Sequence, residues 1–382
     1  MNNLTMSMQS RDNISFPTDY AAILERVASI DPMKYGKTRN FLNGHISYLS
    51  PYISRGVISV KQVMEAIVQK GYPIYAIEKL IQELAWREYF QRVWQVKKSL
   101  IGEDLKQVQV NVAHHEMVAA IQNGATGIDI IDKQITQFYQ TGYLHNHLRM
   151  YLAAITCNIG QAYWAKPSQW MYYHLLDGDI ASNNCSWQWV AGTFSSKKYY
   201  CNQENINKYT FSKQTGTFLD QPYEALVAMP IPFSLQETVA LSLTTKLPPT
   251  SLPNIDIQLP TLIYNSYNMD PNWRKGEKVN RILLLEPSHF NQYPVSDKVI
   301  EFIIALSKNI ENIQLFVGEI KDIQSIYEKA SADINSMLIS KEHPAFDYYP
   351  GVKEERDWMF PKVTGYFNSF FSFWKKCQRF LN

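Results

Sequence analysis

The sequence predicts a mainly α-helical protein in which a long helical region is followed by a small α/β region. Three observations carry this prediction. Up to about residue 210, apolar residues recur at helical spacing between caps and glycines, without strand-like alternation. Residues 229–260 are rich in Pro, Ser and Thr, as linkers are. Short apolar runs then alternate with helical segments. We therefore expect a helical domain (1–228), a linker (229–260) and an α/β domain (261–382).

The composition fits a globular protein, since 46% of the 382 residues are hydrophobic and 19% are charged. The net charge is only +2, so any nucleic-acid site must be a local basic patch. Aromatic residues make up 13%, which fits either a large helical core or surfaces that stack on flat ligands.

The chain gives no sign of a membrane span or a metal cluster. No apolar run approaches the ~18 residues that a span needs, and the N-terminus lacks a signal-peptide pattern. The four cysteines form no CxxC pair, so we expect no metal site or iron–sulfur cluster. A cytoplasmic protein with free thiols is the expectation.

Caps and glycines divide the helical region into segments. Ser59 and Gly71 bound VKQVMEAIVQK, and residues 75–98 carry apolar positions at helical spacing. The same signals predict four further helices: 114–123 before Gly124, 130–141 opened by Asp129, 145–159 before Gly160, and 169–176 opened by Ser168.

The last region alternates strands and helices. The apolar runs RILLLEP (281–287) and IQLFVGEI (313–320) predict buried strands. SDKVIEFIIALSKN (296–309) and DIQSIYEKAS (322–331) predict helices. Such alternation favours a parallel sheet.

Three segments carry chemistry. In the first, YGKTRNFLNGHISYLSPYISRG, Ser50 precedes Pro51 and predicts a helix cap. A helix N-terminus beside the hydroxyls of Ser47 and Ser50 could hold a phosphate. The alternative is an ordinary capped helix.

The second segment is ELAWREYF. On a helix, Glu83, Trp86 and Arg87 share one face, so a carboxylate, an indole and a guanidinium could line one pocket. The alternative is a salt bridge beside a core tryptophan.

The third segment runs from HNHLRM to DGDIASNN. Asn146 and Arg149 lie one turn apart, Asp177 and Asp179 follow a helix break, and Asn183 lies beyond. Buried polar groups need partners, and a polar heterocycle would satisfy them. Arg149 and Asp177 are a plausible buried pair, which could also serve only each other.

Together the three segments resemble the flavin-binding signature of the DNA photolyase and cryptochrome family. ISYLSPY is similar to its phosphate loop, and ELAWRE to its Glu-Trp-Arg helix. HNHLRM, DGDIASNN and WQW resemble the motifs that follow in the family, so the resemblance covers about residues 33–210.

The resemblance implies a U-shaped FAD within a helical domain. The pyrophosphate would be held by Tyr35, Ser47, Leu49 and Ser50, with Arg87 reaching the phosphates. The rings would be surrounded by Asn146, Arg149, Asp177, Asp179 and Asn183. Asn183 would lie near the flavin N5, where family photolyases have asparagine and many cryptochromes have aspartate or cysteine.

The resemblance also implies light-driven repair of cyclobutane pyrimidine dimers in damaged DNA, by electron transfer from reduced FAD. Glu83 would hydrogen-bond the pyrimidine carbonyls, and Trp86 and Trp189 would flank the flipped dimer. Asn146 and Met150 fit this subtype. The DNA backbone contacts would be Arg39, His147, Lys197 and Lys198.

An electron relay to the flavin is implied as well. Trp187 matches the first tryptophan of the family's chain and Trp164 the second, whereas the third falls near Asn111, which is not readily oxidised.

The chain departs from the family in several places. It starts almost directly at the helical region, where the family has an α/β domain with an antenna pigment. Ile46, Tyr48, Tyr143 and His147 replace common family residues, and the segment after WQW differs. We expect 261–382 to pack on the helical domain without a pigment, in a monomer. The alternatives to a photolyase are a cryptochrome-like blue-light sensor and a flavin-binding relic without catalysis.

Overall fold

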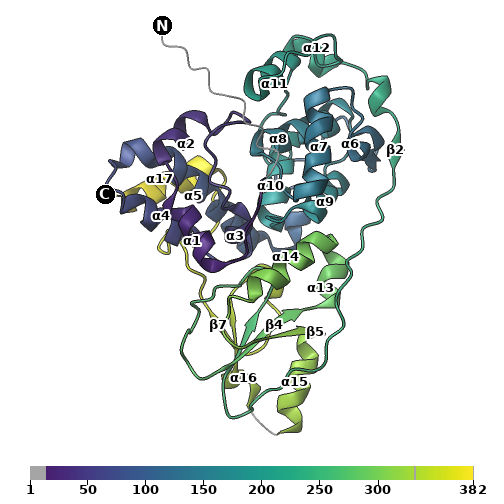
Figure 1. Ribbon diagram of the computed structural model, residues 1–382. Coiled ribbons are helices and arrows are strands. Elements are labelled where there is room, and N and C mark those ends of the chain that lie inside the picture. Colours follow the sequence, from purple (N-terminus) through teal and green to yellow (C-terminus); the bar gives the residue numbers. More distant parts are fainter. Residues whose placement is uncertain (1–13, 331–332, 382) are drawn as a thin grey trace.

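The computed structural model describes residues 14–330 and 333–381, which form a helical part joined to a smaller part built on a parallel sheet (Figure 1). The N-terminal residues in which a signal pattern was sought lie outside this described range. Within it, no helix is both long and apolar enough to cross a membrane.

The helical part confirms most of the predicted segments. Its helices are α1 Tyr20–Ala28, α2 Pro32–Thr38, α3 Ser50–Ser54, α4 Val60–Val68, α5 Ile74–Lys97, α6 Ala119–Asn123, α7 Asp129–Thr141, α8 Asn146–Ala154, α9 Ala165–His174, α10 Ile180–Ala191, α11 Gln203–Thr210 and α12 Tyr223–Ala228. Single turns are η1 Lys98–Gly102, the π-helical η2 Ile155–Ile159, and η3 Phe233–Leu235. Ser59 caps α4 as predicted, in a capping box with Gln62.

Three local predictions in this part are wrong. The expected helix over 114–123 begins only at Ala119, because Met117–Val118 (β1) pairs with Thr238–Val239 (β2) of the linker. Helix α9 begins at Ala165, before Ser168, whose hydroxyl bonds back to the Ala165 carbonyl. Ser50 is the first residue of α3 and gives no side-chain cap. In the first case, pairing with residues distant in the sequence sets where the helix begins. In the other two cases, the turn that precedes the helix does.

The α/β part contains a five-stranded sheet in the order β5-β4-β3-β6-β7, with every pair parallel. The strands are β3 Thr261–Tyr264, β4 Asn280–Leu285, β5 Ile313–Val317, β6 Leu338–Lys341 and β7 Val352–Glu354. The helices are α13 Pro287–Gln292, α14 Asp297–Ser307, α15 Ile320–Lys329, α16 Ile334–Met337 and the single turn η4 Pro344–Phe346. The predicted strands β4 and β5 and helices α14 and α15 are confirmed. The sequence prediction missed β3, β6 and β7.

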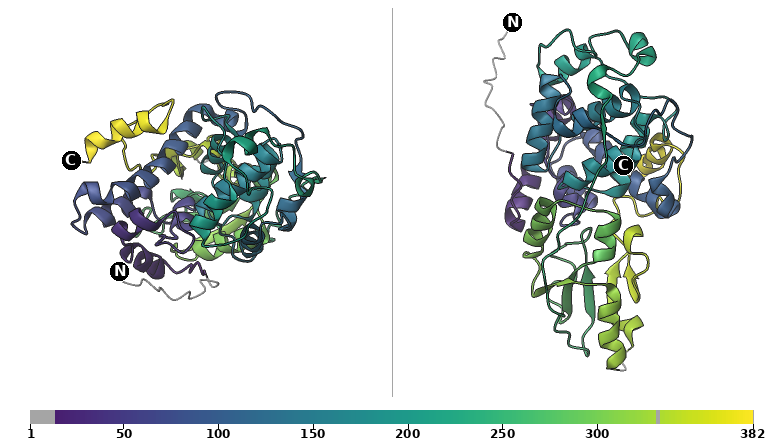
Figure 2. Two further views of the ribbon diagram at one scale, coloured as in Figure 1. Left: turned by 90° about the horizontal axis from the view of Figure 1, so that it is seen from above. Right: turned by 90° about the vertical axis from the view of Figure 1, so that its right-hand side faces the viewer.

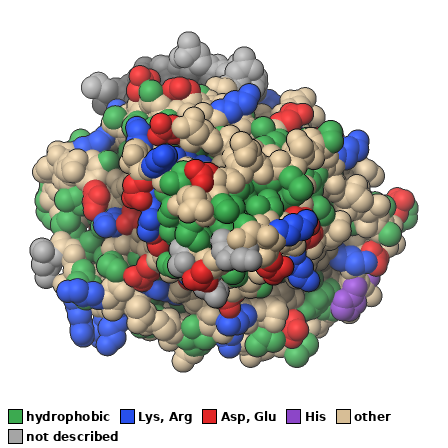
Figure 3. Space-filling view, turned by 90° about the horizontal axis from the view of Figure 1, so that it is seen from below, with side chains coloured by type: hydrophobic (Ala, Val, Ile, Leu, Met, Phe, Trp, Pro, Cys, Tyr) green, Lys and Arg blue, Asp and Glu red, His purple; other side chains and the backbone are tan. Residues whose placement is uncertain are grey.

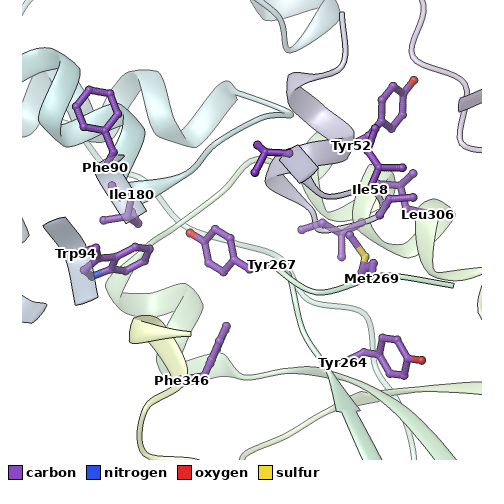
Figure 4. Close-up of a cluster of buried hydrophobic side chains, with 14 of the residues drawn as sticks. Tyr52, Ile58, Phe90, Trp94, Ile180, Tyr264, Tyr267, Met269, Leu306 and Phe346 are labelled. Atoms are coloured by element: carbon purple, nitrogen blue, oxygen red, sulfur yellow. The ribbon is translucent and has the colours of Figure 1, made fainter. Parts of the chain in front are cut away.

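The two parts share one apolar core. Tyr52, Tyr267 and Phe346 belong to the same buried cluster, although they come from opposite sides of the junction (Figure 4). The hydroxyls of Tyr172 and Tyr267 lie 3.0 Å apart across it. The α/β part therefore packs on the helical part, as expected. Its free end carries charged side chains of both signs around apolar ones (Figure 3).

The C-terminal segment returns from the sheet to the helical part (Figure 2). There α17 (Phe370–Cys377) packs on α5 and is followed by the turn η5 Gln378–Phe380. The buried carboxylate of Glu88 accepts hydrogen bonds from the backbone N–H groups of Met359 (2.6 Å) and Phe360 (2.9 Å). These last residues thus cover the helical part, whereas the predicted domain division, which stays a prediction, assigns them to the α/β domain.

Candidate functional site

A cavity of about 440 Å³ lies in the helical part, between α2, α3, α5, α8 and α10. Its volume is within the range of small-molecule and cofactor sites. The three chemistry-bearing segments of the sequence meet there. The predicted site residues that line it are Tyr35, Arg39, Ser47, Ser50, Glu83, Trp86, Arg87, Asn146, His147, Arg149, Met150, Asp177, Asp179, Asn183, Trp187 and Trp189.

Helix α5 contributes one wall. Glu83, Trp86 and Arg87 line the cavity together, as their spacing on a helix predicts. Leu80 and Phe90 extend the same stripe, so the polar groups sit within an apolar surface.

Arg149 and Asp177 form the predicted pair. One guanidinium nitrogen, Nη2, lies 2.9 and 3.0 Å from the two carboxylate oxygens. The Asp177 side chain is 4% exposed, and Arg149 also donates to the Leu144 carbonyl at 2.8 Å. Because both groups border the cavity, the pair fixes charge at its wall rather than in a closed core.

Asp179 accepts three hydrogen bonds from protein donors. It caps α10 by accepting from the Ser182 N–H at 2.7 Å. Its other oxygen accepts from Gln91 Nε2 at 2.7 Å and from Arg87 Nη2 at 3.3 Å. Asp179 therefore positions Arg87 and the start of α10, and leaves little acceptor capacity for a ligand.

Two polar groups of α10 remain available to a ligand. Asn183 donates to the Ser168 carbonyl at 2.9 Å, while its side-chain oxygen accepts no hydrogen bond from the described residues. The Ser182 hydroxyl lines the cavity, is buried, and has no partner in the described part of the chain. Buried polar atoms are normally satisfied, so these groups fit a bound polar molecule.

The rim of the cavity carries a charged pair and a stacked tryptophan. Arg39 Nε lies 3.2 Å from the Glu83 carboxylate, and both side chains are partly exposed. Trp86 stacks on Phe370 of α17, with centroids 3.9 Å apart and planes 11° apart. One face of Trp86 is therefore covered by the C-terminal segment.

The two histidines at the start of α8 are neutral near pH 7. Burial lowers the pKa of His145 to about 4, with a smaller contribution from the charge of His147. Burial and the nearby Arg39 likewise lower the pKa of His147 to about 4. His147 can thus offer a phosphate a neutral hydrogen bond but no positive charge.

Four predicted site residues lie outside the cavity. Leu49 is 1% exposed and belongs to the apolar core. Trp164 is buried and donates to Asp104 at 2.7 Å. Lys198 donates to the Val110 carbonyl at 2.8 Å, whereas Lys197 is exposed.

Sequence reasoning missed several cavity residues: Tyr48, Ser54, Tyr143, His145, Ser182 and Ser186. Ser54 lies one turn after Ser50 and accepts from Arg87 Nη1 at 3.1 Å. Ser182 and Ser186 lie one turn apart on α10. Helical spacing around residues already chosen could have found these three.

Residues 80–221 match the family described as the FAD binding domain of DNA photolyase. The deoxyribodipyrimidine photo-lyase of Buchnera aphidicola subsp. Baizongia pistaciae is 34% identical over 191 residues, 43% of this chain and 38% of the relative. That of Escherichia coli K12 is 29% identical over 205 residues, 50% and 43% respectively. A solved class III photolyase from Agrobacterium tumefaciens is 27% identical, covers 46% of this chain and 38% of its own, and superimposes with a TM-score of 0.42. The chain thus matches about two-fifths of the length of these curated relatives.

Helices enclose the cavity, and arginines paired with carboxylates line it, which suits a polar cofactor. Residues 80–221 resemble the FAD binding domain of DNA photolyase, and FAD is the cofactor that this match indicates. The residues present fit this cofactor. Arg87 and Arg149 provide donors for phosphates, Trp187 and Met171 provide an apolar wall for the flat ring system, and Ser182 offers an unpaired hydroxyl.

Proposed function

We propose that the protein is a deoxyribodipyrimidine photolyase that repairs cyclobutane pyrimidine dimers in DNA, using light and reduced FAD. One observation carries the proposal: a single cavity is lined by residues expected to hold the flavin and by residues expected to hold the lesion. Glu83, Trp86, Asn146 and Met150 are on the lesion side, and Asn183 on the flavin side. Bound FAD would supply the photoexcited electron donor.

The side chains then act by binding and orientation. The carboxyl group of Glu83 would hydrogen-bond the pyrimidine carbonyls, and Arg39, 3.2 Å away, holds it at the rim. Trp86 and Trp189 flank the flipped dimer, with only the free face of Trp86 available because Phe370 covers the other. The Asn183 amide oxygen can accept a hydrogen bond from reduced flavin without adding charge.

The backbone contacts need revision within this proposal. Lys197 remains a candidate for DNA phosphates, since it is exposed. Lys198 is a weaker candidate, because its ammonium group already donates to the Val110 carbonyl. Arg39 and His147 lie at the cavity, where a flipped nucleotide would bring its own phosphates.

A blue-light sensor of the cryptochrome type is the second candidate. The stacking of Phe370 on Trp86 favours it, because a covered lesion-side tryptophan is less suited to contact a substrate. In this reading the C-terminal segment 357–381 would be the element that responds to the flavin.

We also propose a monomer in the cytoplasm. Four cysteines, all buried and unpaired, fit a reducing compartment.

The repair assay separates the two candidates. Purified protein with chemically reduced FAD is illuminated with blue light in the presence of an oligonucleotide that holds one thymine dimer, and the recovery of thymine absorbance is followed. Recovery in light, and none in the dark, is expected. A protein that binds FAD but restores no absorbance would overturn the photolyase proposal and favour the sensor.

A further inference from the structure

Four aromatic rings form a continuous shelf that begins at the cavity rim; we name His147, Tyr209, Phe41 and Phe211 the aromatic shelf. His147 lines the cavity, and its ring lies 5.0 Å from that of Tyr209. Phe41 lies 5.2 Å from Tyr209 and stacks on Phe211 at 5.5 Å and 25°. The shelf thus runs from the cavity outward to the end of α11, which lies far from the sheet (Figure 1).

The backbone holds the shelf together across a long sequence separation. The N–H of Leu42 donates to the Tyr209 carbonyl at 2.9 Å, which ties the loop after α2 to α11. The position of the Phe41 ring is therefore fixed relative to Phe211.

Phe211 has an energetically unfavourable backbone conformation. It is 56% exposed and follows the last residue of α11 with φ at 60°, in the left-handed region. Helix ends of this kind usually carry glycine or asparagine, because a bulky side chain is strained there. Among the described residues, the other aromatic with positive φ is Tyr48 (φ 51°), which lines the cavity. Strain held at an exposed ring points to a ligand.

The segments that carry the shelf are basic. Residues 33–45 and 205–215 contain Lys34, Lys37, Arg39, Lys208 and Lys213 and no acidic residue, while the whole chain has a net charge of only +2. Lys34 and Arg39 are paired with Asp31 and Glu83. Lys37, Lys208 and Lys213 are exposed and pair with no carboxylate of the described residues, and Lys208 Nζ lies 5.3 Å above the Tyr209 ring.

We propose that the aromatic shelf binds unpaired nucleotides of a DNA strand beside the nucleotide that enters the cavity. The proposal rests on the proposed DNA function of this same site. Flipping a nucleotide leaves its neighbours unstacked. Phe211 and Phe41 offer replacement stacking faces, and the three unpaired lysines attract the phosphates. The bases of an intact duplex stack on each other, so the shelf favours single strands.

The test compares the flavin-loaded protein with Phe211→Asn and Phe41→Ala. Fluorescence anisotropy measures binding of labelled oligothymidine and of the same strand annealed to its complement. Each substitution is expected to weaken single-strand binding about five-fold or more. Phe233→Ala, which removes a 90% exposed ring of the linker, is the control and should leave binding unchanged. Phe211→Asn should not lower thermal stability, because asparagine tolerates the left-handed backbone.

The dimer-repair assay runs in parallel to separate the two proposals. Unchanged single-strand affinity in both shelf variants overturns the shelf, and repair by the unsubstituted protein then leaves the photolyase function standing. If the unsubstituted protein shows no repair but single-strand binding still depends on Phe211, the photolyase function is overturned and the shelf proposal stands. If the substitutions instead dissociate a dimer in size-exclusion chromatography, the shelf is a contact between two copies and the proposal is wrong.

Discussion

Arg356, which follows the last strand of the sheet, donates a hydrogen bond of 2.5 Å to the side-chain oxygen of Gln91 on α5. Gln91 in turn donates to Asp179 at 2.7 Å, and Asp179 borders the flavin cavity. Arg356 is held from the other side by Glu342, 3.0 Å away. The α/β part thus reaches the cavity wall through two side chains.

Arg356→Ala should weaken FAD binding, although the substituted residue does not itself line the cavity. Loss of the guanidinium removes the donor to the Gln91 side-chain oxygen and leaves Glu342 with the donor Gln95, and a charged hydrogen bond of this kind contributes about 1–3 kcal/mol. We expect a lower urea midpoint and a lower FAD content after dialysis. Lys362→Ala, an exposed cation of the same segment, is the control. Unaltered FAD retention in the Arg356 variant would contradict the link.

Asp177→Ala should abolish FAD binding or the yield of folded protein. It leaves the partly buried Arg149 unpaired, and breaking such a pair typically costs about 3–5 kcal/mol. Asp177→Asn keeps an acceptor and should lose less. Flavin absorbance and thermal unfolding measure both effects. Full flavin occupancy with native stability in the alanine variant would refute the role of the pair.

Glu83→Gln should lower the repair yield per absorbed photon while FAD stays bound. The substitution replaces the carboxyl group, which pairs with Arg39 at the rim and is proposed to hydrogen-bond the lesion, by a neutral amide of similar size. Glu78→Gln, on the same helix but outside the cavity, is the matched control. Equal repair by both variants would show that Glu83 does not contact the substrate.

Acidification should destabilise the site between about pH 6.5 and 4. The buried His145 stays neutral in the folded protein, where its pKa is about 4, whereas in the unfolded chain it takes up a proton at a higher pH. The unfolded state therefore binds more protons as the pH falls, which removes up to about 3 kcal/mol. His145→Asn keeps an acceptor for the backbone N–H of His147 and should remove the part of this pH dependence that His145 causes, while the likewise lowered pKa of His147 keeps its own part, as chemical denaturation at several pH values would reveal.

Trp187→Phe should nearly abolish the photoreduction of oxidised FAD but spare repair once the flavin is reduced chemically. Trp187 borders the cavity, so it is placed to be the first donor. Trp164→Phe should have a smaller effect, because Tyr163 lies 5.9 Å from the Trp164 ring and offers a neighbouring oxidisable group. Transient absorption decides between these outcomes. Photoreduction at the original rate in both variants would eliminate the relay.

The parts of the fold that local signals determine could be predicted. Ser59 and Gln62 make a capping box with each other, and Glu83, Trp86 and Arg87 share a face because a helix repeats every 3.6 residues. Such features depend only on residues close in sequence. The three segments that line the cavity could therefore be identified without knowing that they lie together in the fold.

The parts that depend on distant residues could not be predicted. Met117 is in a strand only because Val239 pairs with it, and Phe370 covers Trp86 from almost the other end of the chain. The strands β6 and β7 were also missed, because they are only four and three residues long and carry no distinctive sequence pattern. The sequence alone does not show that the ammonium group of Lys198 donates a hydrogen bond to the Val110 carbonyl.

The return of the C-terminal segment to α5 has a consequence for biosynthesis. Glu88 is separated by 272 residues from Phe360, whose backbone it binds. A ribosome therefore makes α5 long before the residues that cover its apolar side. During that interval the nascent helix exposes apolar surface, which favours aggregation and chaperone binding. The stacked pair of Trp86 and Phe370 can form only after Phe370 has been synthesised, so this wall of the cavity cannot be completed until long after α5 has been made.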